Sequence, residues 1–226
     1  MRHITTTAII SGLFIAAQTA FAQCQYEVTA VIEGPPCPWG PAPVTGRAIN
    51  DAGTVVGWWQ QCFEPSQNRP FRWTADGGLE ELDIPVDNVT NGRAMDINNN
   101  GDICGWYTAK DNGEFFQASF VLTGEGEFIN IPAPEDTPQI QAQAINDNRQ
   151  VVGWRGDSSG EPTGAAAFLW EDGELTTILP IDEFFGSRAT DINEAGQITG
   201  HVRFNQTDEE LAFLWDSGEL TVLPPV

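Results

Sequence analysis

Basic residues are scarce in this chain. Ten lysines and arginines stand against 32 aspartates and glutamates, which gives a formal net charge of −22, and Lys110 is the single lysine. A surface this negative repels nucleic acid and anionic lipid, so these two classes of partner are excluded. It attracts cations and favours solubility at high salt, but net charge alone does not define a binding site.

Long apolar runs are also scarce, and the one at the N-terminus is too short to cross a bilayer. It follows Arg2, extends over residues 8–17 and precedes the small-x-small pattern A-F-A at 20–22. This order is typical of a secretory signal peptide covering residues 1–22, with cleavage near Ala22. We therefore expect a secreted or periplasmic protein without membrane insertion, in which residues 23–226 form a single repeat domain.

Groups that commonly perform catalysis are equally rare. His201 is the only histidine after the signal peptide, and the chain contains no nucleophile elbow, phosphate-binding loop or zinc motif. We therefore expect a non-catalytic module with a binding or surface structural role, without a cofactor unless calcium is bound. The alternative is a secreted carbohydrate-active enzyme, because two of the many acids could form a catalytic pair, although none stands out.

Cysteine is limited to four residues, all in the first half of the chain. In an exported protein an even number of cysteines predicts disulfides, here two, and leaves three possible pairings open. Their spacing matches no zinc pattern. The candidates are Cys24, Cys37, Cys62 and Cys104.

What the chain does contain is one unit repeated four times. Each unit has an Ile-Asn pair, a short polar turn, a V-V-G-W type strand, an A-F-L-W type strand and a closing apolar strand that ends in proline. The Ile-Asn isoleucines are Ile49, Ile97, Ile145 and Ile192, so the spacings are 48, 48 and 47 residues. Repetition this regular predicts a repeat architecture.

Within a unit, apolar residues alternate with a period of two and are separated by turn residues, which predicts strands joined as hairpins. Four strands per unit, in repeats of about 48 residues, predict an all-β, β-propeller-like fold. Residues 23–36 would add one N-terminal strand. An open β-array, or closure by dimerisation, is the alternative. The expected units are 40–86, 87–133, 134–180 and 181–226.

These motifs resemble the bacterial extracellular HAF repeat family, which is named for a His-Ala-Phe tripeptide before Leu-Trp. The likeness extends over all four units, and is specific in the I-N, V-V-G and A-F-L-W segments. The resemblance implies an exported β-repeat protein, and it implies no settled activity. The chain departs from the family pattern at the histidine, replaced by Arg69, Ala118, Ala166 and Leu211, and at the closing glycine, replaced by Pro85, Pro132, Pro180 and Pro224.

The stretch D-I-N-N-N-G-D at 96–102 resembles the start of a calcium loop, with oxygen ligands at alternate positions. The places where a closing acid would stand hold Cys104 and Tyr107. The three sister segments keep only the asparagine and mostly the glycine, which favours a hairpin turn capped by asparagine. The candidate calcium ligands are Asp96, Asn98, Asn100 and Asp102.

Polar residues before the Ile-Asn pairs form a second candidate site. They lie at even offsets from the isoleucine, so we expect them on one face of the innermost strand, converging near the propeller axis. Arginines there could bind a small anion or an acidic sugar; the alternative is internal pairing with Asp96 and Asp191. The residues are Arg47, Arg93, Gln141 and Arg188.

Tryptophans recur at fixed places in the repeat, and we expect these to pack between blades. Three aromatic residues break the repeat and are the better candidates for stacking on carbohydrate. They are Trp39, Trp59 and Tyr107.

Overall fold

Strands joined by turns make up the described part of the chain, and no helix occurs in it. In the computed structural model the described residues are 32–63, 67–135, 137–156, 164–179, 186–204 and 209–224. The chain divides into two units, Met1–Val31 and Ile32–Val226, and all described residues belong to the second. The expected signal peptide, Cys24 and most of the expected extra strand lie outside the described residues. Within these residues no helix is long and apolar enough to span a membrane.

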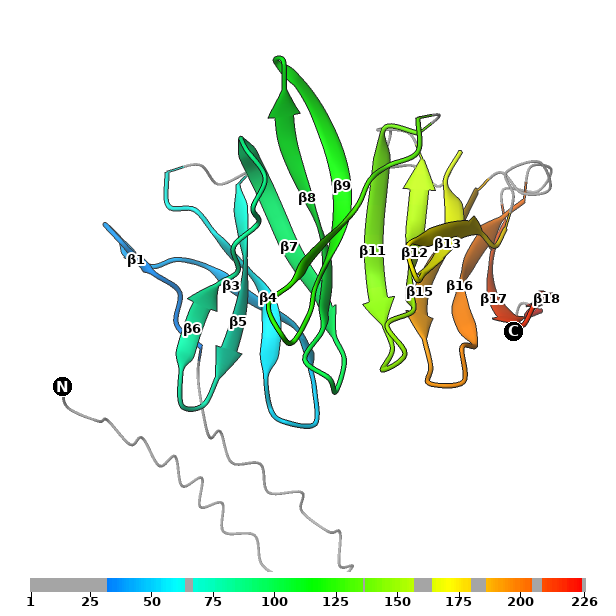
Figure 1. Cartoon of the computed structure of the whole chain (residues 1–226), viewed down its shortest axis with the longest axis horizontal. Helices are drawn as coiled ribbons and strands as arrows, with labels where there is room; N and C mark the ends of the chain where they lie inside the picture. The colour runs from blue at the N-terminus through cyan, green and yellow to red at the C-terminus, as the bar shows by residue number, and fades with distance from the viewer. Residues whose placement is uncertain are drawn as a thin grey trace, which may run out of the picture. The chain divides into compact units, whose positions relative to one another are not determined.

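Sixteen strands form four antiparallel sheets, and the strands of each sheet follow chain order (Figure 1). Sheet 1 contains β3 (Val44–Ile49), β4 (Val55–Gln60), β5 (Asn68–Thr74) and β6 (Gly78–Glu81); sheet 2 contains β7 (Val89–Ile97), β8 (Ile103–Asp111), β9 (Glu114–Leu122) and β10 (Phe128–Ile131). Sheet 3 contains β11 (Gln139–Ile145), β12 (Val151–Gly156), β13 (Ala166–Glu171) and β14 (Glu174–Thr177); sheet 4 contains β15 (Gly186–Ile192), β16 (Ile198–Arg203), β17 (Glu210–Asp216) and β18 (Glu219–Val222). The expected all-β fold of four-stranded antiparallel sheets is confirmed.

The sheets stand side by side in chain order, because each has two apolar faces. We call the face that packs on the next sheet the forward face and the opposite one the rear face. Three core clusters join forward faces to rear faces. They bring Val56 against Ala94 and Ile97, Cys104 and Val121 against Ile145 and Phe168, and Val152 and Ala167 against Ile198 and Phe213.

Each first strand carries a β-bulge at the same place, three residues before the Ile-Asn asparagine. Opposite the bulge lies the glycine of the V-V-G-W strand, whose missing side chain leaves room for a first-strand carbonyl. A Cβ at Gly57, Gly105, Gly153 or Gly200 would overlap the carbonyl oxygen of Thr45, Arg93, Gln141 or Arg188, respectively. The bulged residues are Arg47, Met95, Gln143 and Thr190.

In sheets 3 and 4 the turns between the third and fourth strands are two-residue hairpins, as expected from the sequence, whereas those in sheets 1 and 2 are longer. In sheet 3, Asp172 and Gly173 have φ of 51° and 87° and join strands that end at Glu171 and begin at Glu174. Two consecutive positive φ values are the signature of a type I′ turn, whose twist matches that of the strands.

One disulfide, between Cys37 and Cys62, joins the segment of the short ribbon β1 (Pro36–Cys37) and β2 (Gly40–Pro41) to the loop after β4. The expectation that Cys104 also forms a disulfide is wrong. Cys104 is a free thiol with no solvent exposure, at the forward-face position that valine holds in sheets 1 and 3. It packs as a small apolar side chain between sheets 2 and 3, and burial raises the pKa of its thiol well above the ordinary value.

Candidate functional site

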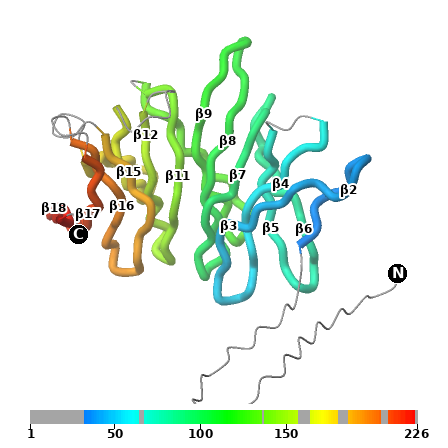
Figure 2. The backbone as a smooth tube through the Cα atoms, turned by 180° about the vertical axis from the view of Figure 1, so that it is seen from behind, coloured from blue at the N-terminus to red at the C-terminus, as the bar shows by residue number. Residues whose placement is uncertain are grey.

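The four Ile-Asn turns lie side by side at one end of the sheets, as both backbone views show (Figures 1 and 2). Inside each turn the asparagine side-chain oxygen accepts from the backbone N–H four residues later. For Asn98 the donor is Asp102 at 2.8 Å, and for Asn146 it is Gln150 at 3.0 Å. The expected turn, in which asparagine caps its own backbone, is therefore present.

The same asparagines also connect one turn to the next. The side-chain amide of each of the first three donates to the backbone carbonyl of its counterpart in the following sheet, which is a long-range contact that the repeat period alone does not reveal. The bonds are Asn50 to Asn98 at 3.1 Å, Asn98 to Asn146 at 2.9 Å and Asn146 to Asn193 at 3.1 Å. We call this series the asparagine ladder.

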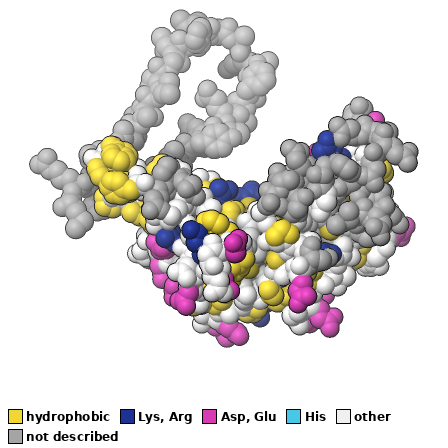
Figure 3. Space-filling model, turned by 90° about the horizontal axis from the view of Figure 1, so that it is seen from above, with side chains coloured by type: hydrophobic (Ala, Val, Ile, Leu, Met, Phe, Trp, Pro, Cys, Tyr) yellow, Lys and Arg dark blue, Asp and Glu magenta, His cyan; other side chains and the backbone are white. Residues whose placement is uncertain are grey.

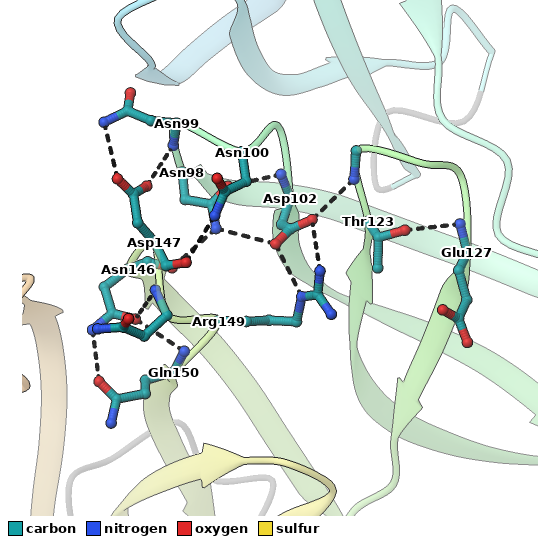
Figure 4. A network of polar contacts seen from close by, with 12 residues as sticks. Asn98, Asn99, Asn100, Asp102, Thr123, Glu127, Asn146, Asp147, Arg149 and Gln150 are labelled. Carbon is teal, nitrogen blue, oxygen red and sulfur yellow. Dashed lines mark hydrogen bonds and ion pairs between the residues drawn. The ribbon is translucent and has the colours of Figure 1, made fainter.

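A second row of hydrogen bonds runs beside the ladder, one residue further along each turn. There a backbone N–H donates to the side chain of the counterpart in the next sheet, and the central contacts are drawn in Figure 4. The bonds are Asp51 to Asn99 at 3.1 Å, Asn99 to Asp147 at 2.7 Å and Asp147 to Glu194 at 3.0 Å.

The proposed calcium ligands take part in this network. The Asp102 carboxylate is 2% exposed and accepts from Arg149 Nε at 2.9 Å, so a guanidinium is its cationic partner. Asp96 instead accepts from the backbone of Ile97 and Ile145, each at 2.9 Å. Within the described residues no group of three or more His, Cys, Asp or Glu side chains is placed to hold a metal ion.

Arg149 stands where the other three turns have glycine, and its φ of 61° matches theirs. A left-handed conformation costs a non-glycine residue about 1 kcal/mol. The ion pair offsets this cost: burial acts to raise the pKa of Asp102, but hydrogen bonds from Arg149, Gly124 and Asn98 outweigh it and hold the pKa below its ordinary value. Arg149 and Asp102 thus tie sheet 3 to sheet 2.

Two of the candidate arginines stack on tryptophan rather than pairing with Asp96 or Asp191. The Arg93 guanidinium lies 4.7 Å from the ring centre of Trp58 and 5.2 Å from that of Trp106. Arg188 lies 4.4 Å from the ring of Trp154. Burial lowers the pKa of Arg93, yet an arginine stays charged, and cation–π contact is the compensation these rings provide.

The expectation that all four candidates share one strand face is wrong, because Arg47 is itself the bulged residue of its strand, whereas the other three pair regularly. Thr45, not Arg47, is the counterpart of Arg93, since each pairs with the tryptophan of its second strand. Gln141 occupies the same place in sheet 3 and donates to Gln117 at 3.3 Å.

The bulged residues meet in a cavity of about 210 Å³ that all four first strands line. Its wall combines one cation, two carboxylates and two neutral polar groups. Sequence reasoning identified Arg47 and the nearby carboxylates but missed the others, since a bulge follows from strand pairing and no residue pattern marks it. The lining residues are Arg47, Ala48, Met95, Asp96, Gln143, Ala144, Thr190 and Asp191. We call this space the central cavity.

Electrostatics in the central cavity are mixed. Burial raises the pKa of Asp96, the hydrogen bonds from Ile145 and Ile97 lower it, and among the charged groups Asp191 raises it while Arg47 lowers it. Arg47 and Asp191 are exposed, so both can reach a solute. The cavity can therefore receive an anionic group at Arg47 and a hydrogen-bond donor at Asp191.

The three aromatic candidates lie in different environments. Tyr107 is 1% exposed and donates its hydroxyl to Asn130 at 2.9 Å, so the expectation that it stacks on a ligand is wrong. Trp59 is half-buried on the rear face of sheet 1. Trp39 is 74% exposed and meets Phe63 edge-on, 5.8 Å between ring centres. The repeated Trp106 and Trp154 are buried, as expected for tryptophans between sheets.

Residues 72–179 match a sequence family described as "Protein of unknown function (DUF3466)". The match runs from β5 in sheet 1 to the end of sheet 3, and it includes the Asn98 and Asn146 turns. No curated protein matches the chain.

Proposed function

We propose that this chain is an exported, non-catalytic, propeller-like repeat module of the HAF type that binds a small polar ligand in the central cavity. The observation that carries the proposal is the convergence of four bulged first strands on one charged cavity. Four strands from four sheets shape the space, and a concave site with a few convergent polar groups is where a ligand is expected to bind.

The ligand chemistry follows from the lining. Arg47 offers a guanidinium, which suits a carboxylate through paired hydrogen bonds. Asp96 and Asp191 accept from ammonium or hydroxyl groups, and Gln143 and Thr190 can do either. A cavity of about 210 Å³ accommodates a molecule of amino-acid or monosaccharide size. We therefore expect a small carboxylic acid that also carries donors, such as an α-amino acid or a sugar acid.

Isothermal titration calorimetry with a panel of α-amino acids, hydroxy acids and sugar acids tests this proposal. Arg47→Met, which installs the residue of sheet 2 at the equivalent bulge, should weaken binding of a positive hit at least tenfold. Arg72→Ala is the matched control, because Arg72 pairs with Glu80 at 2.7 Å on sheet 1, outside the cavity, and should leave binding unchanged. Equal loss in both variants, or no binding by any acid, would refute the proposal.

A carbohydrate-active enzyme is the second candidate, and one observation favours it. Asp96, whose pKa is raised, and Asp191 line the same cavity, as a general acid and its partner carboxylate would. Turnover of chromogenic glycosides that disappears in Asp191→Asn would establish it. If wild type shows no turnover and Asp191→Asn still binds the ligand, the result would favour the binding module over the enzyme.

A further inference from the structure

The outermost faces of the sheet array expose side chains whose counterparts between the sheets are buried or half-buried. On the rear face of sheet 1, Ile49 is 66% exposed, whereas its counterparts Ile97, Ile145 and Ile192 are 6%, 5% and 8% exposed. The isoleucine is the same in all four units. The difference is that sheets 2, 3 and 4 each have a preceding sheet packed on this face.

The forward face of sheet 4 shows the complementary exposure. Leu214 is 38% exposed, while at the same place Val121 in sheet 2 has no exposure and Leu169 in sheet 3 is half-buried. Thr199 and Ala212 are also exposed, although Val152 and Ala167 at these places in sheet 3 are fully buried. In the described part of the chain, sheets 1 and 4 are not hydrogen-bonded to each other.

The asparagine ladder stops at the same two faces. Asn146 donates both to Gln150 within its turn and to Asn193 in the next sheet. Asn193 donates to Gln197 at 2.8 Å and, among the described residues, to no other group. At the opposite end, the Asn50 carbonyl accepts from Gly53 but from no preceding asparagine in the described part.

In the described part of the chain, the Asp191 carboxylate also lacks a hydrogen bond that its counterpart in sheet 2 makes. Its counterpart Asp96 accepts from Ile97 with one oxygen and, with the other, from Ile145 in the next sheet. Asp191 makes the first bond, to Ile192 at 2.9 Å, and its second oxygen has no partner among the described residues. The missing donor to this oxygen would be the backbone N–H of an isoleucine at the position that Ile49 holds in sheet 1.

We infer that the forward face of sheet 4 binds the rear face of sheet 1 in a second copy of this chain. The two faces complement each other because every internal contact between sheets is a forward face on a rear face. An interface between copies would continue the same packing, the ladder from Asn193 to Asn50, and the Asp191 contact. Such an interface is head-to-tail, so two copies can close a ring or more can add in series.

Charge sets the conditions for this association. Each copy carries a net −22, and acidic side chains lie mostly along the border of the surface seen from above (Figure 3). Repulsion between copies therefore opposes the contact at low salt and is screened at physiological ionic strength. The apolar contact through Ile49 and Leu214 is not screened, so association should strengthen with added salt.

Sedimentation velocity of the purified chain over a wide concentration range tests the inference. Wild type should show reversible association that is stronger at 0.5 M than at 0.05 M sodium chloride. Ile49→Glu and Leu214→Glu should each weaken it at least tenfold, since both residues are exposed and the single chain should stay folded. An equimolar mixture of the two variants should form a 1:1 complex that grows no further, because each keeps one intact face.

Phe115→Glu is the matched control. Phe115 is 63% exposed on the β8–β9 hairpin, away from both faces, and its replacement should leave association unchanged. A wild type that stays monomeric at all concentrations would overturn the inference, as would equal weakening by all three variants or failure of the two variants to combine. None of these outcomes depends on ligand binding at Arg47, so the two proposals fail separately.

Discussion

The side-chain amide of Asn98 donates to the backbone carbonyl of Asn146, 48 residues further along the chain, at 2.9 Å. Asn98 is 4% exposed and Asn146 1% exposed, so the bond is protected from water. One residue type thus both caps a hairpin and fastens neighbouring sheets together. Asn50, Asn98 and Asn146 have this double use, whereas Asn193, within the residues that the structure describes, keeps only the turn cap.

The ladder should contribute more to stability in the middle than at its end. Asn146→Ala removes the turn cap and the bond to Asn193, and should lower the free energy of unfolding by about 3 kcal/mol. Asn193→Ala removes the corresponding cap at an exposed site and should cost about 1 kcal/mol. Urea unfolding measures both values, and equal losses would show that the bond between sheets contributes nothing.

Replacing Arg149 with glycine should destabilise the protein, although glycine adopts the positive φ at this position without strain. Arg149→Gly removes the positive-φ cost but leaves the Asp102 carboxylate buried without its cation, and we expect a net loss of about 2 kcal/mol after allowing for the half-exposed guanidinium. Adding Asp102→Thr, the residue that follows glycine in the first turn, should recover most of this loss. A double variant no more stable than Arg149→Gly alone would contradict this account of the pair.

Acidification should weaken the same contact. The ordinary pKa of an aspartate is about 3.9, and that of Asp102 lies lower in the folded chain, so the folded state binds fewer protons there than the unfolded state. The resulting stabilisation is present above about pH 4 and is lost as the pH falls through the folded value. Asp102→Asn should therefore lose less stability than wild type between about pH 5 and pH 3 in thermal melts. Equal losses of stability in wild type and Asp102→Asn over this pH range would contradict the prediction.

The repeated glycine of the second strand should not tolerate a side chain. In Gly153→Ala the new Cβ would overlap the Gln141 carbonyl, which the β-bulge holds in place, and the expected loss is about 3 kcal/mol or more. Gly46→Ala is the control, because the other sheets have alanine there and the nearest atom, in Val55, is 3.4 Å away. Its effect should stay within about 0.5 kcal/mol. Thermal melts of both variants provide the comparison.

Much of the fold could be predicted because its causes are local. The period of two, the glycine-containing turns and the 48-residue spacing are all properties of short segments, and they specified four-stranded antiparallel sheets. The burial of individual side chains was harder to predict from the sequence. Tyr107 and Cys104 looked available in the sequence, and both are buried, because the neighbouring sheets and strands that cover them come from distant segments.

The candidate site shows the same division. Arg47 and Arg93 both lie at even offsets from the isoleucine of their Ile-Asn pair, yet Arg47 lines the central cavity and Arg93 stacks on two tryptophans. Arg47 is the bulged residue of its strand, whereas Arg93 pairs regularly with Trp106, and a bulge exists only once two strands have paired.

By itself the sequence determined that strands and turns form four-stranded antiparallel sheets, since backbone propensity and side-chain alternation act over a few residues. Only the tertiary structure decided what the repeated asparagine does beyond its own turn, which polar groups share a cavity and which faces stay uncovered. Those properties depend on where one sheet meets the next, and the separation of Asn98 from Asn146 shows how far apart in the chain the contacting groups lie.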